Sequence, residues 1–120
     1  VNLIEKIGII NCKSIYTSNY DKLQANIYNL SPDLANWMII EGYGKVIGRP
    51  GLSLQDRELI NVAMLCTNYS EHQLYSHIKG SLNTGSGKKL IKEVIQSTKD
   101  YNSQSNIDNA LELLDNVTSE

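Results

Sequence analysis

Residues 53–83 form the stretch SLQDRELINVAMLCTNYSEHQLYSHIKGSLN, which contains a clear helical pattern. Its apolar residues recur at spacings of three and four, which predicts two helices separated by a break at residues 67–69. The two stripes are Leu59, Val62, Ala63 and Cys66, and then Leu74, Ile78, Ser81 and Leu82. Two helices joined by so short a break are expected to pack as an antiparallel hairpin.

The segments before this hairpin also show helical periodicity. One helix is expected over residues 20–30, behind an Asn19 cap. The next begins at Ser31-Pro32-Asp33, which combines a cap, a first-turn proline and a first-turn carboxylate. It is apolar on two sides and ends at residues 48–51, so we expect it to pack against more than one neighbour, such as a second subunit.

Caps and stripes also place the remaining helices. Ser53 is expected to cap the first hairpin helix, and Ser70 with Gln73 forms a capping box for the second. A helix over residues 88–98 should bury Leu90 among its apolar residues. After a polar linker at residues 102–106, Asn106 is expected to cap the last helix.

These segments predict an all-α fold of about six helices built on the antiparallel hairpin. We expect a single helical domain over residues 19–120. Residues 1–18 are expected to be an N-terminal arm or a short helix, with residues 12–18 irregular.

Composition excludes several classes of protein. The 120 residues are 41% hydrophobic and 20% charged, which is enough apolar side chain for a core. The net charge of -2 argues against nucleic acid as a partner, and the lack of a long apolar run argues against a membrane span. We find no secretory signal, disulfide framework or zinc-ligand spacing, so the expectation is a reduced, cytoplasmic protein without a metal.

Two ionisable residues fall where the apolar pattern would not place them. His77 lies on the apolar face of the second hairpin helix, and Glu58 lies one turn before Val62, on the shoulder of the first stripe. In an antiparallel hairpin their heights differ by about 5–8 Å along the axis, so they can face one pocket. A carboxylate beside an imidazole can orient its tautomer for acid–base work. The alternative is structural: a satisfied core histidine, and a Glu placed by the helix dipole.

Other residues are candidates for binding a substrate. Arg49 could hold a carboxylate through two hydrogen bonds, or could simply cap a helix. His72 could lie at the mouth of the pocket or be solvated, and Gln73 and Tyr43 are further candidates. Cys66 lies on an apolar stripe, which indicates a buried and inert thiol.

Several motifs, taken in order, resemble the carboxymuconolactone decarboxylase family, which also contains the alkylhydroperoxidase D type of peroxidase. They are Arg49-Pro50-Gly51-Leu52, Asp56-Arg57-Glu58-Leu59, Gln73-Leu74-Tyr75-Ser76-His77 and Gly80-Ser81-Leu82-Asn83-Thr84-Gly85. Tyr43-Gly44 resembles the end of the family's preceding helix, and the match covers roughly residues 32–96. The resemblance implies an all-α homo-oligomer, commonly a trimer or a hexamer, with sites near subunit interfaces.

The two branches of the family imply different chemistry for these residues. The peroxidase branch has a Cys-x-x-Cys pair that falls on Ser70 and Gln73, and a Glu and two His that fall on Glu58, His72 and His77. This chain therefore has the Glu and His residues of the peroxidase's proton relay but lacks its redox cysteines. Serine and glutamine form neither a sulfenate nor a disulfide. The decarboxylase branch lacks the cysteine pair and has a histidine at the position of His77. At the position of Glu58 it has a small or polar residue, so this chain differs from it there.

Our first hypothesis is therefore cofactor-independent acid–base chemistry, of decarboxylase or lyase type, on a small carboxylated compound. His77 would be the acid/base, Glu58 its partner and Arg49 the anchor. One alternative is a peroxidase activity that relies on Cys66. Another is a non-catalytic oligomeric binding protein, in which the Glu–His pair serves packing. No cofactor is expected.

Overall fold

A computed structural model describes residues 2–120 of the chain, which contain helices and no strand. The all-α fold class is confirmed. Two compact units divide the chain, Val1–Leu54 and Gln55–Glu120. Whether residues 19–120 act as a single domain stays a prediction. No helix among the described residues is long and apolar enough to cross a bilayer.

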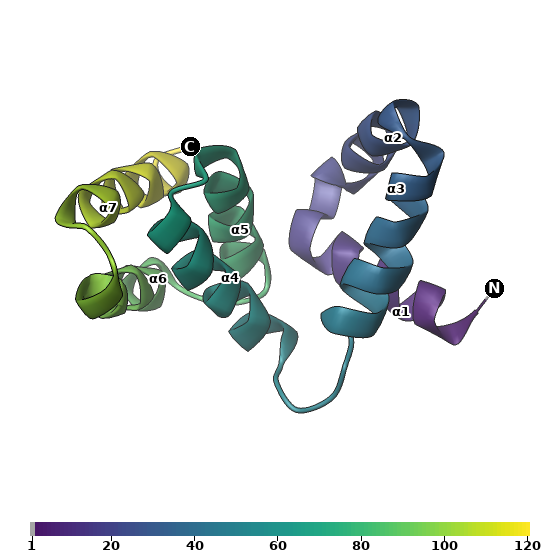
Figure 1. The fold of residues 1–120 in the computed structure, drawn as a ribbon, viewed down its shortest axis with the longest axis horizontal. Coiled ribbons are helices and arrows are strands. Elements are labelled where there is room, and N and C mark those ends of the chain that lie inside the picture. The colour runs from purple at the N-terminus through teal and green to yellow at the C-terminus, as the bar shows by residue number, and fades with distance from the viewer. Residues whose placement is uncertain (1) are drawn as a thin grey trace. The chain divides into compact units, whose positions relative to one another are not determined.

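The first unit holds three α-helices and a π-helical segment (Figure 1). They are α1 (Leu3–Tyr16), the short 3-10 turn η1 (Thr17–Asn19), α2 (Tyr20–Leu30), α3 (Pro32–Trp37) and the π-helix η2 (Met38–Val46). Residues 3–16 are thus helical, and the expectation that residues 12–18 are irregular is wrong. Helix α1 continues through residues 12–16 because this conformation places Cys12 and Ile15 on the same buried face as Gly8.

The helix that begins at Ser31 buries one of its two apolar sides. The Ser31 hydroxyl accepts a hydrogen bond from the Leu34 backbone N–H at 3.2 Å, which confirms the predicted cap. Ile39 and Tyr43 belong to the buried core of the first unit. Trp37, in contrast, keeps 57% of its surface exposed.

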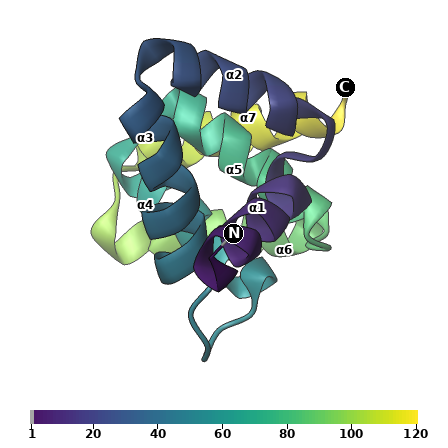
Figure 2. The ribbon, with the colours of Figure 1, turned by 90° about the vertical axis from the view of Figure 1, so that its right-hand side faces the viewer.

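Glycines let α1 approach η2 closely (Figure 2). A Cβ atom added to Gly8 would collide with the backbone carbonyl oxygen of Ile39. One added to Gly44 would lie 2.6 Å from the carbonyl oxygen of Ile4. The absence of side chains at these two positions therefore sets the distance between the two helices.

The second unit consists of α4 (Leu54–Asn68), α5 (Glu71–Asn83), α6 (Lys88–Ser97), the 3-10 turn η3 (Thr98–Tyr101) and α7 (Gln104–Thr118). Helix α4 begins one residue before the boundary between the units. Helices α4 and α5 run in opposite directions and are joined by Tyr69 and Ser70, as the hairpin prediction required (Figure 1). Their stripes meet α6 and α7 in one apolar core, which includes Val62, Leu74 and Ile91.

Several predicted caps and one predicted core residue are wrong. The side chains of Asn19 and Ser70 make no capping hydrogen bond. The last helix begins at Gln104 and is capped by Ser103, whose hydroxyl accepts from the Asn106 backbone N–H at 3.1 Å. The Asn106 side chain is engaged elsewhere, because its amide donates to the Thr67 and Asn102 oxygens. Leu90 is 41% exposed, since it lies on the shoulder of the α6 stripe.

We expect Gly8→Ala to destabilise the chain by about 1–3 kcal/mol, because its methyl group must push α1 away from the η2 backbone. The matched control is Gly42→Ala in η2, where an added Cβ meets nothing within 4 Å. That variant should be neutral or slightly stabilising, since Ala is the better helix former. Urea unfolding of both variants measures the difference, and equal midpoints would contradict the close-packing account.

Candidate functional site

Glu58 lies near the start of α4 and is completely buried. Its Oε1 atom is 2.9 Å from Nδ1 of His77, which projects from α5 and is 8% exposed. The hairpin prediction placed these two side chains close together, and the structure brings them into direct contact. A buried carboxylate is costly unless it is paired, so this contact offsets the desolvation of Glu58.

Asn61 completes the surroundings of the carboxylate. Its side-chain Nδ2 donates a hydrogen bond of 2.9 Å to Oε2 of Glu58. Each carboxylate oxygen of Glu58 therefore has a partner, and the side chain is held in one orientation. Sequence reasoning missed Asn61, although its position three residues after Glu58 is a spacing at which helical side chains meet.

The contact with Glu58 sets the tautomer of His77. An ionised carboxylate only accepts hydrogen bonds, so beside ionised Glu58 the Nδ1 atom of His77 carries the ring proton and donates a hydrogen bond to Oε1. In the neutral ring, Nε2 is then the nitrogen that lacks a proton and can act as a base. The arrangement is typical of an oriented acid–base histidine.

Two further polar side chains are buried on these helices. Arg57, adjacent to Glu58 in the chain, is only 6% exposed. Ser81 lies one turn after His77 on α5, is fully buried, and its hydroxyl has no hydrogen-bond partner among the described residues. A buried hydroxyl without a partner costs free energy, which a polar atom of a ligand could recover.

His72 and Gln73 are both exposed. His72 lies about 140° around α5 from His77, so the two histidines point to different sides of the helix. His72 instead lines a hollow of about 300 Å³ together with Glu71, Tyr75 and Leu113. The substrate-binding roles of His72 and Gln73 stay predictions.

Arg49 and Tyr43 belong to the first unit. Arg49 is exposed, and its Nη1 donates a hydrogen bond of 3.1 Å to the Val46 carbonyl oxygen near the end of η2. Tyr43 is buried, with its hydroxyl 2.8 Å from the hydroxyl of Tyr16. Both residues thus have contacts inside their own unit, and their roles toward a substrate stay predictions.

Cys66 is fully buried in the apolar core, as its stripe position predicted. The Asn102 side chain donates to its Sγ atom at 3.3 Å. Burial raises the pKa of the Cys66 thiol, and the hydrogen bonds with Thr98 and Asn102 oppose that shift only in part. Since the thiolate is the reactive form, these surroundings do not favour redox chemistry at Cys66.

Within residues 2–120, no group of three or more His, Cys, Asp or Glu side chains could hold a metal ion. Asp56, Glu58 and His77 lie on the two hairpin helices, yet they form no such group.

We expect His77→Ala to lower the free energy of unfolding by about 3–5 kcal/mol, because it leaves the buried Glu58 carboxylate without one of its two partners. His72→Ala is the matched control and should change stability by no more than about 0.5 kcal/mol, since His72 is exposed. Urea unfolding measures both variants. Equal losses would mean that the pair contributes nothing specific.

The Cys66 thiol should react slowly with iodoacetamide in the folded chain and rapidly in urea. Because burial raises its pKa, the folded chain keeps the proton at a pH where the unfolded chain releases it. The free energy of unfolding should therefore fall as the pH rises above about 8.5, the ordinary thiol pKa. Unfolding curves between about pH 8 and 9.5 measure this slope, which Cys66→Ala should flatten. A slope that is unchanged in that variant would contradict the assignment.

The chain is 31% identical over 70 residues to 4-carboxymuconolactone decarboxylase from Acinetobacter baylyi, a match that covers 58% of this chain and 52% of that protein. It is 30% identical over 88 residues to peroxisomal protein 2 from Saccharomyces cerevisiae, covering 72% of this chain and 31% of that protein. The chain thus spans about half the length of the first relative and about a third of the second.

A family model matches residues 32–116, which include both helices of the hairpin and the Glu58–His77 pair. The chain therefore belongs to the carboxymuconolactone decarboxylase family.

Proposed function

We propose that this chain catalyses acid–base chemistry on a small carboxylated compound, without a cofactor. The observation that carries the proposal is the 2.9 Å contact between Glu58 and Nδ1 of His77, with Asn61 on the other carboxylate oxygen. It supplies a histidine of fixed tautomer whose Nε2 can exchange protons. The unpartnered Ser81 hydroxyl, one turn away, supports a polar ligand beside the histidine.

A carboxylated lactone fits this chemistry, and one of the relatives is named for the decarboxylation of such a compound. In the reaction, the bond between the ring carbon and the carboxylate breaks and carbon dioxide leaves. The electron pair passes into the conjugated lactone, whose carbonyl is the electron sink. Protonated His77 then gives its Nε2 proton to carbon, and water restores that proton. Glu58 stabilises the charged imidazole before the transfer and holds the ring in place.

The same proposal includes self-association of the chain, as the family resemblance implies. Exposed apolar side chains support it, because Leu34 and Trp37 project from α3 and are 43% and 57% exposed. On α4, Ile60 and Met64 are 43% and 54% exposed and lie one turn apart. Large apolar side chains at helical spacing are typical of surfaces that are covered in an assembly.

Turnover of 4-carboxymuconolactone tests the proposed reaction. We expect the chain to release carbon dioxide from it, with His77→Ala lowering kcat/KM by about 100-fold or more, the usual contribution of a general acid–base group. Glu58→Gln should cause a smaller loss, because it keeps a side chain of the same shape but removes the charge. Glu93→Gln, an exposed carboxylate on α6, is the matched control and should leave the rate unchanged.

A second measurement separates the acid–base pair from the choice of substrate. The chain has only two histidines, so nitrogen-15 shifts of the imidazoles report each tautomer individually. His77 should show protonated Nδ1 in the chain as it stands and a mixed population in Glu58→Gln. A fixed His77 tautomer without turnover would reject the lactone as the substrate. A mixed tautomer population in the unmodified chain would reject the proposed acid–base role of the Glu58–His77 pair.

A further inference from the structure

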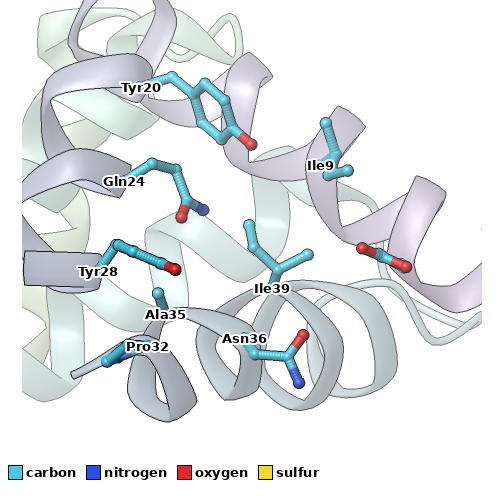
Figure 3. Close-up of a pocket in the computed structure, with 9 residues that line it drawn as sticks. Ile9, Tyr20, Gln24, Tyr28, Pro32, Ala35, Asn36 and Ile39 are labelled. Carbon is cyan, nitrogen blue, oxygen red and sulfur yellow. The ribbon is translucent and has the colours of Figure 1, made fainter.

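A cavity of about 250 Å³ lies within the first unit, between α1, α2 and the helix formed by α3 and η2 (Figure 3). Its lining belongs entirely to residues 5–39, so it is independent of the Glu58–His77 pair on α4 and α5. It is open to solvent on one side, since the lining residue Tyr28 is 60% exposed, and its volume is below the roughly 300–1,000 Å³ of pockets for drug-sized ligands, so a small molecule would fill it.

One helix supplies most of the polar groups of this cavity. Tyr20, Gln24 and Tyr28 are spaced four residues apart along α2 and therefore project from the same side of it. Figure 3 shows the two phenol hydroxyls and the Gln24 amide pointing into the space, across from Ile9 and Ile39. The cavity thus has a polar side and an apolar side.

The Gln24 amide is the feature that points to a ligand. Its Nε2 atom is buried and has no hydrogen-bond partner among the described residues. The amide lies near enough to the Tyr20 hydroxyl to oppose, as a hydrogen-bond donor, part of the rise in the Tyr20 pKa that burial causes, although its Nε2 atom has no acceptor within 3.5 Å. A buried N–H donor left without an acceptor costs free energy, so an acceptor oxygen inside the cavity would be stabilised.

Glu5 gives the cavity its charge. Its side chain lines the space from α1, is half-buried, and makes no hydrogen bond or ion pair with residues 2–120. No Lys or Arg lines the cavity beside it. A carboxylate in such a position attracts a cation that can donate hydrogen bonds, which an organic ammonium group does. Ile9, Ala35 and Ile39 provide an apolar surface for the carbon chain between the two ends.

We propose that this cavity binds a small amino alcohol, with its ammonium group on Glu5 and its hydroxyl oxygen accepting from Nε2 of Gln24. Three further polar groups line the cavity and can form the remaining hydrogen bonds of the ligand: the Tyr20 hydroxyl, the Tyr28 hydroxyl and the Asn36 amide. The site is additional to the acid–base site and does not depend on the proposed reaction.

The test is an NMR titration of the full, nitrogen-15-labelled chain with 5-amino-1-pentanol. We expect shift changes confined to α1, α2, α3 and the first turn of η2. Two analogues of the same length are the ligand controls: 1,5-pentanediol lacks the charge, and 5-hydroxypentanoate reverses it. The amine should bind about 3- to 10-fold more tightly than the diol, the range expected for a partly exposed charged hydrogen bond. The acid should not bind.

Variants identify the groups responsible. Glu5→Gln should weaken the amine about 3- to 10-fold and leave the diol unchanged, whereas Gln24→Leu should weaken both. Glu41→Gln is the matched control, because Glu41 pairs with Lys45 on the surface at 2.8 Å and does not line the cavity. Equal binding of amine and acid, shift changes outside these helices, or full affinity in Glu5→Gln would each overturn the proposal.

Discussion

The burial of the Glu58 carboxylate is the constraint on which the second unit depends. A fully buried charge must be paired, and the hydrogen bonds from Asn61 and His77 meet that requirement at 2.9 Å each. One partner comes from the same helix and the other from the opposite helix of the hairpin. The register of α4 against α5 is therefore tied to a polar contact as well as to the apolar stripes.

The same contact places polar side chains between two helices of an all-α unit. Helix packing alone would place apolar side chains along the α4–α5 contact. Glu58 and His77 replace part of that packing with an oriented imidazole, and Ser81 adds a buried hydroxyl one turn further on. All three residues lie within residues 32–116, the part of the chain that the family model matches.

The first unit follows a different rule. Its helices are held by close backbone approach at Gly8 and Gly44 and by the buried cluster around Cys12, Ile39 and Tyr43. That packing leaves an open space toward α2, which the Glu5 carboxylate and the Gln24 amide line. Each unit therefore has a buried polar atom without a hydrogen-bond partner among the described residues, Nε2 of Gln24 in the first and the Ser81 hydroxyl in the second.

Sequence patterns alone predicted the helices after residue 19, their order and the hairpin, because apolar spacing and proline or serine signals act over a few residues. They also predicted that Glu58 and His77 can face one pocket, since a short connection leaves an antiparallel hairpin few alternatives. Other features depend on contacts between residues that are distant in the chain, and these became visible only in the folded structure. Asn106 does not cap the last helix, because its side-chain amide donates hydrogen bonds to Thr67 and Asn102. Residues 12–16 became helical because their apolar face is buried in the core of the first unit. Local patterns do not contain these contacts, since each is formed by side chains from segments that meet only in the folded chain.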